Sequence, residues 1–440
     1  MKYTRYPRYR ATGVEWIGDM PEGWSLKPLK RAAAINPDVL SEETEPDYEI
    51  DYVDIGDVSQ IGGIGSSSRM PFSAAPSRAR RRVRHGDTVL STVRTYLKAV
   101  AYIESPPENR IVSTGFACLR PARTFSPKFL SRCVQADEFI GLVVSRSVGV
   151  SYPAISPTVL GSIPVPCPPL PEQEAITAFL DAKTAEIDAL IAKKERLLEL
   201  LKEKRTALIT RLVTQGLDSS APMKASGVPW APTIPSYWQI RRNAYLFRER
   251  FDAGVEDLPI LMVSLHTGVS DGAEAEDPRG RTRRFIEDRT AYKRVRPGDL
   301  VFNMMRAWQG AFGVAPTEGL VSPAYTVARP LDGVNGAYFA ALFRTPGYMK
   351  DVERYSYGVA DFRWRLYWVN FRGLCSFLPP IDEQAAIMAR VDAVTAETHR
   401  LEEQVRLAID RLREYRTALI SAAVTGKIDV RKLTPTAPCQ

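Results

Sequence analysis

Arginine is the residue type whose chemistry most clearly suggests a function in this chain, and it clusters at two comparable places. Each cluster lies just before or around a Gly-Asp pair, Gly86-Asp87 in one half and Gly298-Asp299 in the other. A guanidinium can bind a phosphate or donate two hydrogen bonds to the edge of guanine, so such clusters can both position and read a nucleic acid. For one isolated cluster a solvated basic face is the alternative, but recurrence in two otherwise different segments favours binding. The candidates are Arg78, Arg80, Arg81, Arg82 and Arg84 in the first cluster and Arg281, Arg283, Arg284, Arg289, Lys293, Arg294 and Arg296 in the second.

Aromatic residues accompany cations after the strand that follows each Gly-Asp pair. Arg94, Tyr96 and Lys98 stand there in the first half, and Arg306 and Trp308 in the second. Aromatic rings at these places could contact bases or sugars, or they could belong to a core.

A further mixed cluster near the end of the second half holds two DNA-binding candidates, Arg363 and Arg365. Between them stands Trp364, for which contact with DNA and packing in a core are equally open, as they are for Trp308. Tryptophans of a recurring scaffold motif are predicted to pack in cores: Trp16, Trp24, Trp230 and Trp238.

The sequence does not contain the residue types of a catalytic site at the spacing that catalysis would require. There is no Asn/Asp-Pro-Pro-Tyr/Phe tetrapeptide to orient an adenine amino group, and no glycine-rich strand-to-helix loop for S-adenosylmethionine. Gly62-Gly63-Ile64-Gly65 lacks the lysine and the following helix of a phosphate loop, so we predict a flexible loop. Asp38 and Asp47 lack a nearby acidic-x-Lys element, and the histidines lack metal-ligand spacing: His85, His266 and His399. We expect no catalytic residue, no metal and no cofactor.

The elements that would position the candidate residues occur twice. Residues 171–218 recur at 382–429, 211 positions later and without a gap. Arg205-Thr206-Ala207-Leu208-Ile209 returns unchanged as Arg416-Thr417-Ala418-Leu419-Ile420. Each copy closes one half of the chain, so one module is used twice, rather than as a short solenoid repeat. Two similar halves suit a ligand with two related halves, of which duplex DNA is the commonest.

Shorter matches extend the duplication toward the start of each half. The motif at 13–24 returns at 227–238, 214 positions later, and the Gly-Asp pairs are 212 positions apart. Val112-Ser113 returns as Val321-Ser322, 209 positions later. The segments between these anchors share little sequence and hold short β-type runs broken by Gly, Pro and Asp. Each half is therefore expected to be a mixed, β-rich domain, giving an α/β (α+β) chain whose common scaffold carries two different surfaces.

Each repeated segment predicts a long helix. Prolines at 168–171 and 379–380 precede it, and acidic residues in its first turn suit the helix dipole. Apolar residues recur at alternating steps of four and three, which is the pattern of a coiled-coil seam. The predicted helix-pair or subunit interface consists of Ile176, Leu180, Ile187, Leu190, Leu197, Leu201 and Leu208 in the first helix and Ile387, Val391, Val394, Leu401, Val405, Leu412, Tyr415 and Leu419 in the second.

The seam of the first helix differs from that of the second. Lysines interrupt it at positions 183, 194 and 204, and neighbouring apolar residues widen it, which indicates contact with more than one partner surface. Two equivalent helices pack most simply about a pseudo-two-fold axis, which makes them antiparallel. A helix of about 43 residues spans roughly 65 Å, so the pair could hold the two halves a fixed distance apart.

The composition is that of an ordinary soluble protein. The 440 residues suffice for two or more domains, with 45% hydrophobic and 25% charged residues. The net charge of +8 weakly favours a polyanionic partner. Five scattered cysteines without a C-x-x-C pair suit a reducing compartment, and neither a signal peptide nor a membrane-length apolar stretch is present. We expect a cytoplasmic protein.

Several of these motifs together resemble the specificity subunit of type I restriction-modification systems. They are the motif at 13–24, the Gly86-Asp87 strand, Val112-Ser113-Thr114-Gly115-Phe116 and the segment Pro-Pro-Leu-Pro-Glu-Gln-Glu at 168–174. The resemblance covers almost the whole chain, in the order domain, helix, domain, helix. It implies two target recognition domains, each reading one half of a bipartite, asymmetric double-stranded DNA site. It also implies that the helices set the spacer and dock two methyltransferase (modification) subunits, which translocase-endonuclease (restriction) subunits join.

On this resemblance the chain is a non-catalytic DNA-binding subunit with five segments. Thr184-Ala185-Glu186-Ile187 is similar to an element whose copy number sets the half-site gap in some family members. The segments are target recognition domain 1 at 1–169, the central conserved helix or spacer at 170–218, target recognition domain 2 at 219–380, the C-terminal conserved helix at 381–430, and a flexible tail at 431–440.

The second half departs from the family pattern. Pro323-Ala324-Tyr325 replaces Thr114-Gly115-Phe116, and residues 361–365 have no clear counterpart in the first half. DNA contacts therefore do not transfer from one domain to the other. Three alternatives stay open: the specificity subunit of another multisubunit restriction system, a single-chain restriction-modification enzyme with degenerate motifs, and a coiled-coil adaptor that binds no DNA. The missing tetrapeptide argues against the enzyme, and the duplicated arginine clusters argue against the adaptor.

Overall fold

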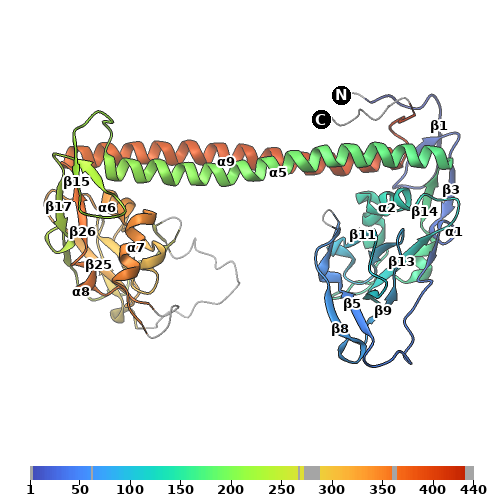
Figure 1. Cartoon of the computed structure of the whole chain (residues 1–440), viewed down its shortest axis with the longest axis horizontal. Coiled ribbons are helices and arrows are strands. Elements are labelled where there is room, and N and C mark those ends of the chain that lie inside the picture. The colour runs from blue at the N-terminus through green and yellow to red at the C-terminus, as the bar shows by residue number, and fades with distance from the viewer. Residues whose placement is uncertain (1–2, 61–62, 266–267, 272–287, 359–363, 432–440) are drawn as a thin grey trace. The chain divides into compact units, whose positions relative to one another are not determined.

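The computed structural model describes residues 3–60, 63–265, 268–271, 288–358 and 364–431 (Figure 1). By contact, the chain forms two compact units, which we call unit 1 (Met1–Glu195 with Leu407–Gln440) and unit 2 (Arg196–Arg406). The division falls inside both long helices, so each unit contains the start of one helix and the end of the other. The boundaries predicted above divide the chain in sequence order instead, and they stay a proposal.

Two long helices close the two halves of the chain: α5 (Leu170–Gln215) has 46 residues and α9 (Ile381–Val424) has 44. In unit 1, Asp188 of α5 binds Arg416 and Glu195 binds Arg413, so residue numbers rise along α5 as they fall along α9. In unit 2, Arg205 bonds His399 at 2.8 Å. The described part of each unit therefore holds the two helices side by side and antiparallel, as the seam predicts (Figure 1).

A four-stranded antiparallel sheet is common to both units. Its order is β11-β10-β13-β4 in unit 1 and β23-β22-β25-β18 in unit 2. Thr88 pairs with Leu119, and Leu300 pairs with Ala328. Because 88 to 300 is 212 positions and 119 to 328 is 209, the offsets between the sequence anchors reappear in the strand register. The strands are β4 (Ala33–Ile35), β10 (Thr88–Ser91), β11 (Val100–Tyr102), β13 (Phe116–Pro121), β18 (Phe247–Glu249), β22 (Leu300–Asn303), β23 (Phe312–Val314) and β25 (Tyr325–Pro330).

The repeated Gly-Asp pairs form the turns before β10 and β22. Gly86 and Gly298 have φ angles of 88° and 89°, a conformation that favours glycine. Buried Asp87 accepts a hydrogen bond from the Arg84 backbone N–H, and Asp299 accepts the same bond from Arg296, each at 2.9 Å. Each carboxylate also binds a guanidinium, supplied by Arg120 on β13 in unit 1 and by Arg250 after β18 in unit 2.

The strands that carry the arginine clusters correspond between the units, because β9 pairs with β12 and β21 with β24 in the same register. Unit 1 has a mixed four-stranded sheet, β8-β5-β12-β9, in which only β5 and β12 are parallel. The described residues of unit 2 form two antiparallel strand pairs at this place, β19-β20 and β21-β24, which the parallel bridge Ile260–Leu320 joins as β5 joins β12 in unit 1. The bounds are β5 (Glu49–Val53), β8 (Ser68–Pro71), β9 (Ala79–Arg82), β12 (Arg110–Ser113), β19 (Leu261–Ser264), β20 (Gly268–Asp271), β21 (Lys293–Val295) and β24 (Gly319–Val321).

A buried glutamine ties the start of each long helix to a short helix of its unit. The Gln173 amide oxygen accepts from the Ser126 N–H at 2.8 Å, at the start of α2 (Pro127–Gln135), and its amide nitrogen donates to two backbone carbonyls. Gln384 makes the same three bonds in unit 2, where it accepts from the Asn335 N–H at 2.8 Å, at the start of α6 (Gly336–Phe343). This contact explains why the Glu-Gln pair recurs.

The end of each long helix packs against the opening motif of a half. Gly426 follows α9, and a side chain there would meet Pro21 and Trp24. Gly216 follows α5 and is enclosed in the same way by Trp238 and Glu383, and both glycines have φ near 75°. The remaining strand pairs are β1 (Tyr9–Ala11) with β2 (Asp19–Pro21), β3 (Ser25–Pro28) with β14 (Pro164–Cys167), β6 (Val58–Ser59) with β7 (Gly63–Ile64), β15 (Met223–Ala225) with β16 (Thr233–Pro235), and β17 (Gln239–Arg242) with β26 (Cys375–Leu378).

The main core of each unit lies between its sheets, its short helices and the long helices. Trp16, Trp24 and Trp238 are buried, as predicted, and Trp230 is partly buried against the core of unit 2. Burying an aromatic side chain of this kind stabilises the fold by about 1.5–3 kcal/mol. The other helices are α1 (Leu29–Ala32), α3 (Asp137–Ser145), α4 (Pro157–Ser162), α7 (Pro346–Arg354) and α8 (Trp368–Phe371).

Candidate nucleic-acid interface

The first arginine cluster lies on and beside β9, and much of its charge is paired within unit 1. Arg78 binds Asp54 at 2.6 Å and Arg84 binds Asp38 at 2.7 Å. The Arg80 guanidinium lies 4.6 Å from the centre of the Phe72 ring, and burial lowers the pKa of Arg81. Arg82 is exposed and makes no ion pair with any described residue. The carboxylates offset most of the charge of Arg78 and Arg84 and hold their remaining N–H donors in place, whereas Arg82 keeps both its charge and its donors for an external partner.

The second cluster lies around β21 and is also largely paired. Arg294 binds Glu318 at 2.6 Å, and Arg296 approaches Asp252 at 3.5 Å. Lys293 is partly buried, donates to the Tyr325 carbonyl at 2.7 Å, and has a pKa lowered by that burial. Arg289 donates to two backbone carbonyls. Three candidates lie outside the described residues: Arg281, Arg283 and Arg284.

An exposed surface of unit 1, which we call surface 1, combines a cation with aromatic and apolar side chains. Arg94 stacks on the Tyr152 ring at 4.6 Å, and Tyr96 beside it is 53% exposed. A backbone bridge between Val93 and Ala154 joins the end of β10 to the loop at 146–155. Surface 1 consists of Arg94, Val148, Val150 and Tyr152, whereas Tyr96 lines a cleft with Ile191 and Glu195 of α5. Lys98, predicted with them, binds Asp137 at 3.1 Å.

Unit 2 has an exposed surface of the same kind, which we call surface 2. Its rings Tyr357 and Tyr367 lie 5.9 Å apart, and Tyr357 pairs through its backbone with Arg365. Surface 2 consists of Met305, Arg306, Tyr357, Arg365 and Tyr367, all exposed. The partly buried rings of Trp308 and Trp364 lie 5.7 Å apart, and Trp308 donates to the Met305 carbonyl, so this pair supports the surface. Arg363 lies outside the described residues.

Comparison with known proteins agrees with this architecture. Residues 22–200 match the family model of the type I restriction modification DNA specificity domain. The type I restriction enzyme StySPI specificity subunit of Salmonella potsdam is 22% identical, over 93% of this chain and 90% of that protein. The chain is thus similar to type I restriction-modification specificity subunits over most of its length.

Solved structures show the same fold. The HsdS subunit of Thermoanaerobacter tengcongensis has a TM-score of 0.53 and 21% identity, covering 93% of this chain and 98% of that one. A chain from a structure of the complex assembly and conformational transition of the type I R-M system has a TM-score of 0.63 and 21% identity, covering 93% and 99%. The predicted class, two mixed domains with two long helices, is confirmed.

Within this specificity-subunit fold, the predicted seam residues fall into three groups. Ile176, Leu180, Ile187, Ile387, Val391, Val394 and Leu419 are buried, and Leu201, Leu208, Leu401, Val405 and Leu412 are partly buried. Leu190, Leu197 and Tyr415 are 43%, 42% and 46% exposed. These three side chains are thus more exposed than the rest of the predicted seam, and the Tyr415 hydroxyl bonds the Tyr3 hydroxyl at 3.3 Å.

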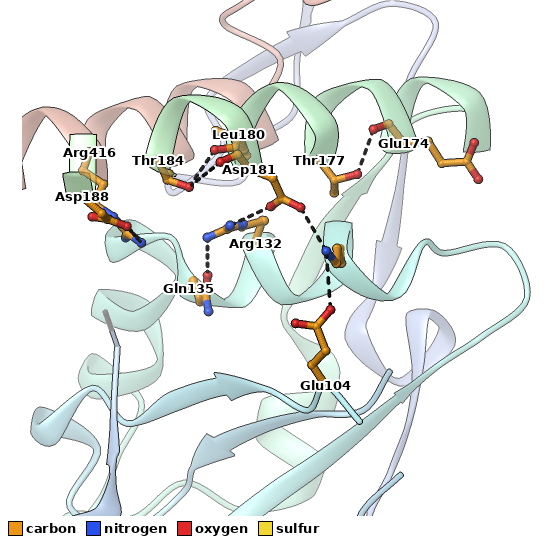
Figure 2. Close-up of polar contacts among 11 residues, drawn as sticks. Glu104, Arg132, Gln135, Glu174, Thr177, Leu180, Asp181, Thr184, Asp188 and Arg416 are labelled. Atoms are coloured by element: carbon orange, nitrogen blue, oxygen red, sulfur yellow. Dashed lines mark hydrogen bonds and ion pairs between the residues drawn. The ribbon is translucent and has the colours of Figure 1, made fainter. Parts of the chain in front are cut away.

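Ion pairs fasten α2 to α5 in unit 1. Asp181 of α5 binds Arg132 of α2 at 2.8 Å and Lys128 at 3.1 Å, and Lys128 also approaches Glu104 at 3.9 Å. The hydrogen bond to Asp181 raises the pKa of Lys128. Figure 2 shows Asp181 reaching from α5 to Arg132, with the Asp188–Arg416 pair beside them. We call this cluster the α2 dock.

Sequence reasoning missed most residues of each exposed surface. Val148, Val150 and Tyr152 were not candidates, because residues 147–153 contain no charged side chain that would indicate nucleic-acid binding. Residues 361–363 lie outside the described residues, but Tyr357 and Arg365 have structural counterparts in unit 1, since the backbone bridge Val148–Ala154 matches the bridge Tyr357–Arg365. The missing counterpart of Arg365 is thus Ala154, which sequence similarity alone could not reveal.

No metal or membrane element emerges from the described part of the chain. No group of three or more His, Cys, Asp or Glu residues there is placed to hold a metal ion. The same residues contain no helix that is both long and apolar enough to cross a membrane.

Proposed function

We propose that this chain is the DNA sequence-recognition subunit of a type I restriction-modification complex, and that surfaces 1 and 2 each read one half of a bipartite, asymmetric site. The observation that carries the proposal is a duplicated scaffold bearing two different exposed surfaces, each with arginine and tyrosine side chains. A bipartite site with unlike halves needs this arrangement, because a common frame sets position while different side chains read different bases.

In this proposal, phosphate contacts and base contacts fall to different arginines. Arginines held by carboxylates, such as Arg78 and Arg294, keep further N–H donors at fixed places, which suits hydrogen bonds to the DNA backbone. Arg94 and Arg306 lie on exposed loops and make no ion pair with any described residue, so their guanidinium donors can reach a base edge. Specificity would then depend on both units jointly.

Modification and cleavage would belong to partner chains. We infer that two methyltransferase subunits dock on the long helices, where Leu190, Leu197 and Tyr415 expose apolar surface, and that translocase-endonuclease subunits join this core. Each helix half would present a similar surface to one methyltransferase. The chain itself would be non-catalytic and would act in the cytoplasm, where the DNA is.

One experiment tests the recognition role directly: mapping methylated bases across the genome with and without this gene. Loss of one bipartite motif on deletion, with its return on complementation, is the expected result. An unchanged methylation pattern, in a strain whose methyltransferase subunit is expressed, would contradict the proposal.

Binding in solution gives a second readout. Affinity of the chain with its methyltransferase partner for a duplex containing the mapped motif should fall steeply between about 50 and 200 mM salt, because phosphate neutralisation releases counterions. Affinity that does not change over this range would favour an adaptor that binds no DNA.

A further inference from the structure

Two carboxylates beside each Gly-Asp turn occupy corresponding positions in the two units. The offset of 212 that relates the Gly-Asp pairs takes Asp87 to Asp299. The offset of 214 that relates β4 to β18 takes Asp38 to Asp252. In unit 1, Arg120 of β13 binds Asp87 at 2.8 Å and approaches Asp38 at 4.0 Å. One guanidinium of the central sheet therefore lies between both carboxylates.

Unit 2 takes the corresponding guanidinium from a different strand. Arg250, which follows β18, lies 3.0 Å from each of the two carboxylates. The residue that corresponds to Arg120 is Arg329 of β25, since the offset of 209 relates β13 to β25. Arg329 is exposed and makes no ion pair with any described residue. The exchange therefore leaves Arg329 without the structural role that Arg120 has in unit 1.

A second arginine lies directly opposite Arg329. It is Arg248 of β18, whose place in unit 1 is taken by the exposed Ala34. Directly opposite residues of an antiparallel pair have side chains on the same face of the sheet, and like charges there destabilise it. Among the described residues neither arginine has an ion-pair partner, and this includes the exposed Asp332 beyond the end of β25. A bound anion would offset the repulsion between the two guanidinium groups.

The charge at this edge of the central sheet therefore differs between the units. We call the unit 2 residues the edge cluster, and they are Arg248, Arg250, Arg296, Arg329, Asp252 and Asp299. Four cations and two carboxylates give the edge cluster a net charge of +2. The corresponding residues of unit 1 have two cations and two carboxylates, and thus no net charge: Ala34, Asn36, Arg84, Arg120, Asp38 and Asp87.

An occupant of the edge cluster must be anionic and must meet unit 2 differently from unit 1. Two copies of one methyltransferase subunit would contact corresponding surfaces of the two units, whereas the excess charge is present in unit 2 alone. Duplex DNA with unlike half-sites satisfies both conditions, because it carries phosphates along its whole length and need not be held alike at both ends. Arg296 also belongs to the second arginine cluster, so the edge cluster adjoins residues already expected to bind DNA.

We propose that Arg248 and Arg329 bind backbone phosphates beside the half-site that unit 2 reads, a contact that unit 1 does not make at its own half-site. The proposal rests on the recognition role proposed above and adds an asymmetric backbone contact to it. Guanidinium groups bind phosphate oxygens through paired, charge-assisted hydrogen bonds. Because phosphate contacts carry no base preference, the two arginines should position unit 2 on the duplex without changing which bases are read.

The experiment measures binding of the full chain, with its methyltransferase partner, to a duplex that contains the mapped motif. One phosphate at a time is replaced by an uncharged methylphosphonate, and the replaced position is moved through and beyond both half-sites. Some replacements should weaken binding of the parent protein but not of a variant with both Arg248→Gln and Arg329→Gln. The replacements that distinguish the two proteins should lie beside one half-site only.

Salt titration gives a second readout on the same proteins. Each single change should reduce the slope of log affinity against log salt by about one unit, and the double change by about two. At about 50 mM salt the double variant should bind at least about tenfold more weakly, with the same preference among bases. The melting temperature of the free chain should not fall, because the changes remove a like-charge pair rather than an ion pair.

Arg31→Gln is the matched control, since it removes the same charge from an exposed position of α1 in unit 1. It should leave unchanged the methylphosphonate effects that depend on Arg248 and Arg329. The proposal is overturned if the double variant keeps the salt slope of the parent and its response to every methylphosphonate. It is also overturned if that variant loses the methyltransferase subunit, because the edge cluster would then bind an acidic protein surface. Failure of the parent to bind the motif at all would instead contradict the recognition role itself, so the two failures are distinguishable.

Discussion

The two units share strand order and register in their central sheets and in the strand pairs that carry the arginine clusters, β9-β12 and β21-β24, whereas the exposed side chains on and beside these strands differ. The shared parts all hold the long helices or brace the sheet: Gln173 with Gln384, Gly216 with Gly426, and Asp87 with Asp299. The differing parts are exposed. The two units therefore have the same structure where they contact the long helices and the central sheet. They differ in the exposed side chains, with which each unit would bind its own ligand.

The largest expected effect tests whether the two buried glutamines, Gln173 and Gln384, make equivalent contacts in the two units. Gln173→Ala leaves the Ser126 N–H and two carbonyls without their partner, so unit 1 should lose about 3 kcal/mol of stability. Gln384→Ala should destabilise unit 2 by a similar amount. Hydrogen exchange resolved by unit measures both, and Glu174→Ala, at an exposed neighbouring position, is the control. Destabilisation of both units by either single change would contradict independent, equivalent contacts.

The next effect separates the two exposed surfaces. Arg94→Ala should weaken DNA binding by about 1–3 kcal/mol and relax the sequence preference in one half-site only. Arg306→Ala should do the same in the other half-site. Binding to duplexes with single substitutions in each half measures both effects. If both variants relaxed the sequence preference in the same half-site, or neither relaxed it in either half-site, surfaces 1 and 2 would not recognise separate half-sites.

Part of this contrast could be predicted from the sequence, because periodicity and repetition are local signals. The seam and the repeated Pro-Pro and Glu-Gln residues predicted both long helices and their antiparallel packing. The register of the central sheets could be anticipated from the offsets of the Gly-Asp and Val-Ser anchors. The prediction that Trp16, Trp24 and Trp238 pack in cores is confirmed.

The exposed surfaces could not be predicted because they depend on which carboxylate reaches which arginine. Asp54 and Asp38 lie far from Arg78 and Arg84 in sequence and pair with them only through the fold. Similarly, nothing in the sequence of 146–155 marks Tyr152 as a partner of Arg94. The ion pairs of the α2 dock could not be predicted for the same reason, since they join residues about fifty positions apart in the sequence.

A smaller effect distinguishes paired arginines from those on the exposed surfaces. Arg78→Gln should weaken binding by less than about 1 kcal/mol, uniformly across sequences, and reduce the slope of affinity against salt by about one unit. The reason is that Arg78 is held by Asp54 and offers its remaining N–H donors to a phosphate rather than to a base edge. A salt titration of binding measures the slope. A change in half-site preference would instead place Arg78 among the reading residues.

The smallest effect concerns the ion pairs of the α2 dock, for whose cations Lys128 and Arg132 unit 2 has Ala337 and Ala341 at the corresponding positions of α6. Asp181→Ala removes the carboxylate that binds both Lys128 and Arg132, and partly exposed pairs of this kind contribute only about 0.5–1 kcal/mol. Asp392→Ala is the matched change in unit 2, where alanines stand opposite, and it should cost nothing measurable. Hydrogen exchange in α2 and α6 provides the measurement, because loosening of the dock raises exchange in the short helix before the sheet opens. Equal effects at the two positions would mean that Asp181 acts within α5 itself, and that the two units are fastened to the long helices in the same way.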